Sequence, residues 1–232
     1  MPVIVITGAS RGIGYAAANY FLARDFTVIG CSRGQTSIEH PNYSHYQVDT
    51  SKEEEVRPWA RDVKKKFGRI DILVCNVGLV NLGSVVGATS LTEFKGFIDA
   101  ILVSTFLVCR EFAKIMTLQG YGRIINITSI QSVLHTPGTC AYSSAKMAVV
   151  EFTKVLAKEV ARYGVTCNIV SPSLVNTQSA SAFGEKWAQN ILSAQTIQRK
   201  IEPDELCSII EFFAKPESSL LTGQILHTCY VN

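Results

Sequence analysis

Tyr142 and Lys146 are the two residues of this sequence whose types and spacing suggest catalysis most directly. Residues four apart on a helix share one face, so the phenol and the ammonium can lie side by side at the wall of a pocket. A positive charge beside a tyrosine favours the phenolate and lowers a pKa that is otherwise near about 10. The phenol then becomes a usable proton donor or acceptor near neutral pH. Surface helices also produce this pair by chance, so the rest of the chain has to decide.

Ser129, thirteen residues before Tyr142, is the next candidate. Residues 122–129 contain three isoleucines and predict a strand that ends at this serine. In doubly wound sheets the ligand crevice lies outside the carboxyl ends of the strands, which places the Ser129 hydroxyl where a substrate should sit. The loop of residues 130–138 should border the substrate and determine which one is chosen. His135 in this loop is a candidate substrate contact, although a loop histidine is more often simply solvated.

A glycine-rich turn at residues 7–14 follows the first apolar run of the chain, Val3 to Ile6. That run is short, continuous and β-branched, the pattern of a strand buried on both faces. Helix-forming residues 15–22 come directly after the turn. Strand, glycine turn and helix in this order direct backbone N–H groups and a helix N-terminus at a phosphate. The sequence therefore predicts a dinucleotide cofactor at this turn.

Apolar runs alternate with helix-forming segments along the whole chain. This alternation predicts a single-domain, Rossmann-like doubly wound parallel sheet, a three-layer α/β/α fold. The predicted strands are residues 3–6, 27–31, 46–48, 70–75, 122–129, 167–170 and 221–226. The predicted helices with defined ranges are residues 15–22, 90–119, 141–162 and 186–192. Another helix opens at a capping box on Ser51, where Pro58 must bend it or displace its start, and a last helix opens at Glu202.

The glycine turn and the three candidate catalytic residues together resemble the short-chain dehydrogenase/reductase family. The residues that carry this resemblance are Thr7, Gly8, Gly12, Gly14, Ser129, Tyr142 and Lys146. Their order and spacing match the family over essentially the whole chain. The strand Arg123 to Asn126 and the segment Ile127 to Ser129 look nearest to 3-oxoacyl-carrier-protein reductases, although many members share these features.

The resemblance implies an NADPH-dependent reductase of a carbonyl compound. Ser129 would hydrogen-bond the carbonyl oxygen, Tyr142 would give it a proton, and Lys146 would bind the ribose and keep the tyrosine acidic. The cofactor-binding residues that it implies are Thr7, Gly8, Ser10, Arg11, Gly12, Ile13, Gly14, Arg33, Asp49, Asn76, Gly78, Tyr142, Lys146, Pro172, Val175 and Thr177. It also implies a substrate lid around residues 178–200 and a homodimer or homotetramer formed through helices 90–119 and 140–163.

Arg33 favours NADP(H) over NAD(H). The second predicted strand ends in Ser32 and Arg33 rather than in a carboxylate. A carboxylate there would bind a ribose 2′-hydroxyl and repel a 2′-phosphate, whereas arginine can hold that phosphate with charge-assisted hydrogen bonds. Arg11 inside the glycine turn points the same way. The alternative is that both arginines are solvated surface residues.

Several positions depart from the family pattern. Ile101 stands where related enzymes have an asparagine that helps to hold a water connecting the catalytic lysine to solvent, and isoleucine forms no hydrogen bond. Ser104, one helical turn away, is a polar candidate for the missing role. Val77 and Ser173 replace an alanine and a glycine. These departures keep a second hypothesis open, a cofactor-binding protein with weak or no turnover that acts as a sensor or a partner subunit.

Composition bounds the remaining possibilities. The 232 residues are 47% hydrophobic and 18% charged, which fits one compact domain over residues 1–232. The net charge of +3 is spread along the chain, so we expect no nucleic-acid partner. The sequence shows no signal peptide and no run of membrane-spanning length, so we expect a cytoplasmic protein without a membrane partner. Seven cysteines lie mostly in apolar runs and predict reduced, buried thiols, and four scattered histidines predict no metal site.

Overall fold

The computed structural model describes residues 1–78, 84–178 and 184–231. Within these ranges, seven parallel strands form one sheet in the order β3-β2-β1-β4-β5-β6-β7. The strands are β1 (Val3–Thr7), β2 (Thr27–Ser32), β3 (Tyr43–Gln47), β4 (Ile72–Cys75), β5 (Gly122–Ile127), β6 (Val165–Ser171) and β7 (Ile225–His227). The order reverses beside β1, so the carboxyl ends of β1 and β4 form the switch point at which doubly wound sheets bind ligands. This sheet confirms the predicted fold class.

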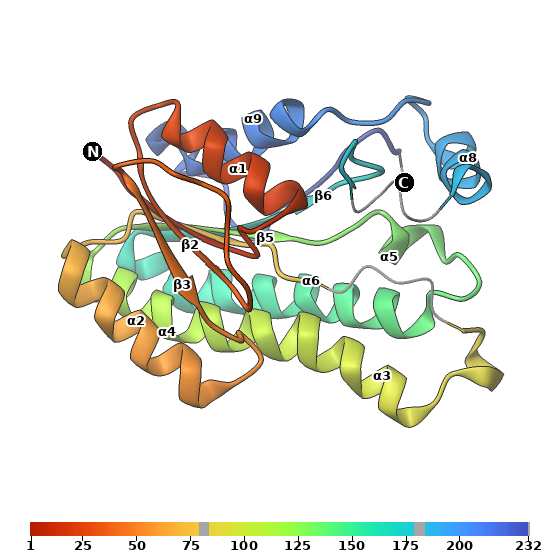
Figure 1. Cartoon of the computed structure of the whole chain (residues 1–232), viewed down its shortest axis with the longest axis horizontal. Helices are drawn as coiled ribbons and strands as arrows, with labels where there is room; N and C mark the ends of the chain where they lie inside the picture. The colour runs from red at the N-terminus through yellow and green to blue at the C-terminus, as the bar shows by residue number, and fades with distance from the viewer. Residues whose placement is uncertain (79–83, 179–183, 232) are drawn as a thin grey trace.

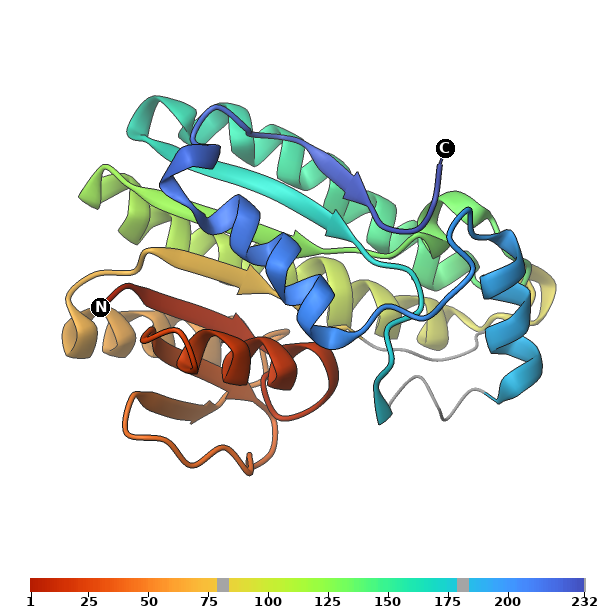
Figure 2. The same ribbon diagram turned by 90° about the horizontal axis from the view of Figure 1, so that it is seen from above.

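Helices cover both faces of the sheet, as Figure 1 shows. The α-helices are α1 (Gly12–Leu22), α2 (Glu53–Phe67), α3 (Leu91–Phe97), α4 (Ser104–Gln119), α5 (Gln131–Leu134), α6 (Cys140–Val160), α8 (Glu185–Ala194) and α9 (Pro203–Ala214). Short 3₁₀ turns lie at η1 (Val86–Ala88), η3 (Ala161–Tyr163) and η4 (Pro216–Ser218). Helices α1 and α9 pack on one face, and α2, α4 and α6 pack on the other. In Figure 2 the strand arrows point the same way, with α8 beyond their carboxyl ends.

Two apolar layers hold the helices to the sheet. On one side Phe21 of α1 and Ile210 of α9 are fully buried against the strands. On the other, Trp59 of α2 meets Phe112 of α4 edge to face, with ring centres 5.0 Å apart. Truncating a buried aromatic such as Phe112 to alanine typically costs about 3–5 kcal/mol. Together the layers fix the sheet, and so the strand ends at which the candidate residues lie.

The predicted helix over residues 90–119 is continuous but not uniform. Ser90 caps α3 by accepting a 3.1 Å hydrogen bond from the Glu93 N–H. Between α3 and α4 the chain forms a wider π-helix, η2 (Ile98–Val103), which contains Ile101. Such π-segments inside α-helices occur frequently at functional sites.

Several boundaries differ from the sequence prediction. Strand β3 begins at Tyr43 rather than at residue 46, and β7 is confined to Ile225–His227. The capping box on Ser51 is wrong, because Lys52 is the N-cap of α2. The Ser51 hydroxyl instead donates a 2.7 Å hydrogen bond to Asp49, which draws it away from the helix. Helix α2 also continues through Pro58.

Candidate active site

A cavity of about 1130 Å³ lies at the carboxyl ends of the strands. It collects most of the residues that the sequence singled out, from the ends of strands β1 to β6 and from α1 and α6. The predicted residues that line it are Gly8, Ser10, Arg11, Gly12, Ile13, Arg33, Asp49, Asn76, Gly78, Ser129, Tyr142, Lys146, Pro172, Val175 and Thr177. The predicted convergence of these residues on one crevice therefore holds in three dimensions.

Thr7 and Gly14 belong to the wall behind the cavity rather than to its lining. The Thr7 hydroxyl accepts hydrogen bonds from the N–H groups of Asn76 at 2.9 Å and Val77 at 3.2 Å, which ties the ends of β1 and β4 together. A Cβ on Gly14 would lie 2.3 Å from the carbonyl oxygen of Gly8. Both residues shape the turn, and their predicted contact with a cofactor stays a prediction.

Tyr142 lies in the first turn of α6, with its side chain hydrogen-bonded to that of Ser129. Burial raises the pKa of the Tyr142 phenol, and the hydrogen bond from Ser129 opposes this effect without cancelling it. Ser129 is held in turn, because its hydroxyl oxygen accepts a 3.2 Å hydrogen bond from the Gln131 N–H. A phenol kept protonated beside a second hydroxyl can donate a proton to an oxygen placed between them.

Lys146, four residues further along α6, is 4% exposed. Its ammonium lies 5.9 Å from the centre of the Tyr142 ring and donates a 2.8 Å hydrogen bond to the carbonyl of Ile127. Burial lowers the pKa of this lysine to about 8. Burial raises the pKa of Tyr142 in this structure and the hydrogen bond from Ser129 is what opposes it, so the expected lowering of this pKa by Lys146 is not seen here.

Ile101 is fully buried, in an apolar cluster with Phe97, Ala141, Ala145 and Val149. A Cβ added to Gly78 would lie 3.4 Å from the Lys146 ammonium and 3.9 Å from an Ile101 side-chain carbon, which places Ile101 close behind the lysine. Ser104, the candidate replacement for the family asparagine, shares its hydroxyl hydrogen bond with Thr50. An apolar wall therefore stands at the position where related enzymes have an amide.

The two arginines that favour a 2′-phosphate both line the cavity and are exposed. Arg11 is the N-cap residue of α1, with extended backbone, and Arg33 follows the end of β2. Burial pushes the pKa of nearby Asp49 up, but hydrogen bonds from Ser51 and the charges of Lys52 and Arg33 outweigh it and hold that pKa below its ordinary value. Asp49 is thus an ionised hydrogen-bond acceptor at the edge of the cavity.

Other lining residues were not singled out from the sequence. They include Ser32, Gly34, Thr50, Asp99, Gln131, Thr139, Trp187 and Ile191. Trp187 and Ile191 are four apart on α8, so the helical pattern of residues 186–192 was their available signal. Helix α8 confirms that predicted helix, whereas residues 179–183 of the expected lid lie outside the described residues. His135 is not among the residues that line the cavity, so its contact with a substrate stays a prediction.

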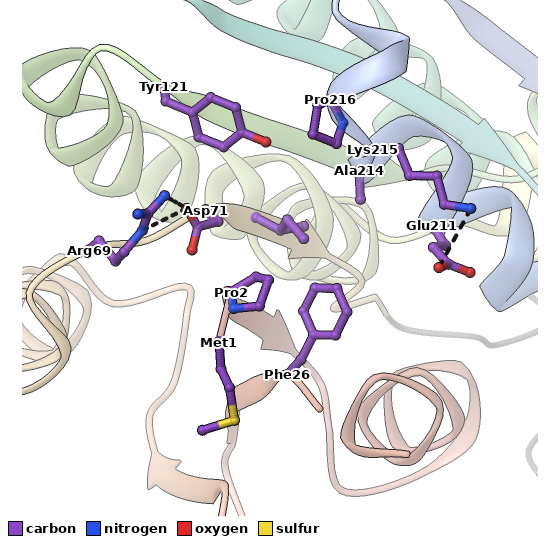
Figure 3. Close-up of a pocket in the computed structure, with 11 residues that line it drawn as sticks. Met1, Pro2, Phe26, Arg69, Asp71, Tyr121, Glu211, Ala214, Lys215 and Pro216 are labelled. Atoms are coloured by element: carbon purple, nitrogen blue, oxygen red, sulfur yellow. Dashed lines mark hydrogen bonds and ion pairs between the residues drawn. The ribbon is translucent and has the colours of Figure 1, made fainter. Parts of the chain in front are cut away.

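A second cavity, of about 520 Å³, lies at the amino ends of strands β1, β4 and β5. Figure 3 shows Arg69 turned toward Asp71 and Lys215 toward Glu211 around it. Because these charged side chains pair with one another, they are not available to bind a charged ligand in this cavity.

In the three described ranges, no group of three or more His, Cys, Asp or Glu side chains is placed to hold a metal ion. Every helix in those ranges is too short or too polar to span a bilayer.

The chain is similar to known enzymes over almost its full length. A family model described as Enoyl-(Acyl carrier protein) reductase matches residues 8–229. The 3-oxoacyl-(acyl-carrier-protein) reductase FabG of Vibrio cholerae is 30% identical in an alignment of 231 positions that covers 97% of this chain and 94% of that protein. The 3-oxoacyl-(acyl-carrier-protein) reductase of Synechocystis sp. is 33% identical over 96% of this chain and 93% of that protein.

Solved structures agree with these relatives. ElxO with NADP bound superimposes with a TM-score of 0.91 and 29% identity, covering 97% of this chain and 96% of that chain. A tyrosine-to-phenylalanine variant of ElxO with NADPH bound has the same TM-score and coverage. The ligand-free aldohexose dehydrogenase AldT of Thermoplasma acidophilum gives a TM-score of 0.90 at 28% identity, covering 98% of this chain and 92% of that chain.

Proposed function

Because this chain belongs to the short-chain dehydrogenase/reductase family, we propose that it is an NADPH-dependent oxidoreductase that reduces a carbonyl compound to an alcohol. The observation that carries the proposal is the meeting of Ser129 and Tyr142, side chain to side chain, above the buried Lys146 in the large cavity. Two hydroxyls that share a hydrogen bond at a strand end can receive one carbonyl oxygen between them.

The glycine turn fits a dinucleotide. Gly8 and Gly12 both have positive φ, at 71° and 58°, and line the cavity at the N-terminus of α1. A Cβ on Gly8 would lie 3.1 Å from the Asn76 side chain, so the turn depends on the missing side chain. Exposed N–H groups at a helix N-terminus suit a pyrophosphate, and Arg33 suits a 2′-phosphate. The ElxO structures, which have NADP and NADPH bound, support the same choice.

Each proposed catalytic residue has a distinct task. NADPH, when bound, supplies the hydride for the carbonyl carbon. The Ser129 hydroxyl donates a hydrogen bond to the carbonyl oxygen, and the Tyr142 phenol gives that oxygen its proton. Lys146, held at the Ile127 carbonyl, places a cation beside the phenol. It would also hydrogen-bond the ribose of the cofactor. With its pKa raised by burial, Tyr142 is protonated at neutral pH, which suits reduction rather than oxidation.

The substrate we propose is a ketone, with 3-oxoacyl thioesters as the class to test first. The names of the Vibrio cholerae and Synechocystis relatives support this class. The described part of the lid, α8, brings Trp187 and Ile191 to the cavity, and their apolar side chains suit an acyl chain.

We further propose a single cytoplasmic domain, residues 1–232, that assembles as a homodimer or homotetramer. Phe106 of α4 and Met147 and Val155 of α6 support assembly through these helices, since each is at least 40% exposed on the sheet-distal side of the fold. Light scattering of the purified protein tests the state directly. A monomer at micromolar concentration would contradict the proposal.

The experiment that tests the function follows NADPH absorbance with purified protein and a panel of diketones, quinones and 3-oxoacyl thioesters. We expect oxidation of NADPH with at least one member and far slower oxidation of NADH. NADPH binding in calorimetry without oxidation by any member would favour instead a cofactor-binding protein without turnover. The buried Ile101 is the observation that keeps this second function in view.

A further inference from the structure

His45 lies under the turn that carries Arg33, although nothing in the catalytic scheme uses it. Strands β2 and β3 run side by side with Gly30 opposite His45, so the imidazole stands next to the end of β2. Its Nε2 lies 3.0 Å from the Ser32 hydroxyl and 3.0 Å from the Gly34 carbonyl oxygen. Ser32 and Gly34 flank Arg33, and all three residues line the cavity. The histidine therefore contacts both sides of the arginine's turn.

The hydrogen bonds around His45 select one tautomer. The Gly34 carbonyl can only accept, so Nε2 must carry the proton. The Ser32 hydroxyl donates to the same carbonyl at 2.8 Å, which leaves its oxygen free to accept from Nε2. Nδ1 is then bare and accepts from the Tyr43 phenol at 2.9 Å. Every polar atom of the group is satisfied in this one arrangement.

Gly30 makes the arrangement possible. A Cβ on Gly30 would lie 2.1 Å from the Tyr43 phenol oxygen and 2.8 Å from the Cβ of Ala9. The Tyr43 ring can lie over β2 and reach Nδ1 because this side chain is absent. Ala9 is part of the glycine turn, whose N–H at this residue donates to the Cys31 carbonyl at 3.1 Å. The cluster thus joins the arginine's turn to the phosphate turn.

We propose that His45 is a positioning residue that fixes the Ser32 to Gly34 turn, and that it thereby determines how strongly Arg33 discriminates a 2′-phosphate from a 2′-hydroxyl. The inference rests on the proposed use of NADPH. A turn that is ordered before binding spares the ligand the cost of ordering it. Only a ligand that contacts Arg33 benefits from the ordered turn. Loss of the histidine therefore weakens the binding of NADPH and leaves the binding of NADH nearly unchanged.

The test measures dissociation constants by calorimetry for NADPH and NADH, and for 2′,5′-ADP and 5′-AMP as the matching fragments. Loss of one such hydrogen-bonded anchor in His45→Leu should weaken NADPH and 2′,5′-ADP by about threefold to tenfold. NADH and 5′-AMP should change by less than about twofold. His45→Gln, which offers an N–H donor to the turn, should restore part of the discrimination. His40→Leu is the matched control, since His40 is exposed before β3.

Tyr43→Phe provides a second measurement if His45→Leu fails to fold. Without the phenol proton, Nδ1 can keep the proton itself and Nε2 loses its donor role, so the same selective loss should follow at smaller size. Equal weakening of NADPH and NADH, or no change in their ratio in either variant, would overturn the inference. Failure of the proposed function is distinguishable, because the unsubstituted protein itself would then fail to prefer NADPH.

Discussion

The ammonium of Lys146 lies 5.9 Å from the centre of the Tyr142 ring and donates its hydrogen bond to the carbonyl of Ile127. The two residues are neighbours on α6, yet the lysine is anchored to β5. The phenol is thus governed by its own burial and by Ser129, while the lysine supplies a cation held in a fixed place. Proton donation by Tyr142 and the effect of the buried Lys146 on the stability of the protein can therefore be tested separately.

The buried lysine should make stability depend on pH in alkaline solution. Its pKa is about 8 in the folded protein against an ordinary 10.5. Between these two pH values the unfolded chain holds a proton on this lysine that the folded chain has released. The free energy of unfolding therefore rises with pH across this window, and the gain is lost again as the pH falls through about 8. Below that pH, the lysine lowers the free energy of unfolding by about 3 kcal/mol relative to a neutral side chain.

Urea denaturation of Lys146→Met and of the unsubstituted protein from pH 7 to pH 10.5 checks this expectation. Taking the difference at each pH removes the contributions of tyrosines and cysteines that titrate in the same range. The advantage of Lys146→Met should be largest at pH 7 and should shrink as pH rises. A difference that stays constant across the range would show that Lys146 is not desolvated.

Arg33→Asp should reverse the preference for a 2′-phosphate. Loss of charge-assisted hydrogen bonds and the new like-charge repulsion should weaken NADPH binding at least about tenfold, whereas NADH should change by less than about threefold. Fluorescence titration with both cofactors measures the two constants. Arg61→Asp, an exposed change on α2, is the control. Parallel losses for both cofactors would mean that Arg33 does not contact the phosphate.

Gly14→Ala should damage the glycine turn. The new Cβ would meet the Gly8 carbonyl oxygen at 2.3 Å, and a backbone atom cannot move aside without shifting the turn. We expect a loss of about 1–3 kcal/mol in the free energy of unfolding, together with weaker cofactor binding. In Gly96→Ala the new Cβ meets no atom of the described chain within 4 Å, so this helical control should gain about 0.5–1 kcal/mol. Equal stability of the two variants in thermal unfolding would show that a Cβ at residue 14 does not clash with the Gly8 carbonyl oxygen.

Ile101→Asn should restore a polar neighbour to Lys146 at a cost in stability. An amide placed in this apolar cluster should lower the free energy of unfolding by about 2 kcal/mol. If the apolar wall slows the return of a proton to the site, the substitution should also reduce the solvent isotope effect on kcat. Ile101→Val is the apolar control and should leave that effect unchanged. If Ile101→Asn leaves the solvent isotope effect unaltered, the apolar side chain at this position does not limit the return of a proton to the site.

The sequence predicted the fold well because its signals were local. Continuous β-branched runs such as Val3 to Ile6 can be satisfied only in a buried strand, and strand ends of a parallel sheet meet at one edge. Ser129 could therefore be placed at the ligand crevice from the residue pattern, whereas its pairing with Tyr142 came from the resemblance to the short-chain dehydrogenase/reductase family. The burial predicted for Cys31, Cys75, Cys109 and Cys167 is confirmed as well, and all seven cysteines, each within the described ranges, are free.

What the sequence could not predict depends on contacts between distant elements. The pKa of Tyr142 follows from the balance of burial against the hydrogen bond from Ser129, and that balance requires the packed site. The π-helix around Ile101 offers no residue pattern of its own. His45 is one of four scattered histidines in the sequence, and only the register of β3 against β2 gives it partners. Thr7 was assigned to the cofactor site from the family resemblance, and the sequence could not show that its hydroxyl accepts hydrogen bonds from the N–H groups of Asn76 and Val77.

The proton-donating role of Tyr142 is tested most directly by Tyr142→Phe, with NADPH binding and substrate reduction measured on the same preparation. The ring, its edge contact with Phe97 and the fold should survive, so NADPH should bind within about threefold of the unsubstituted protein. Reduction should fall by at least about a hundredfold, the usual size of general acid catalysis. Tyr163→Phe, a partly exposed tyrosine beyond the end of α6, should keep full activity. Substantial turnover by Tyr142→Phe would contradict the assignment of Tyr142 as the proton donor.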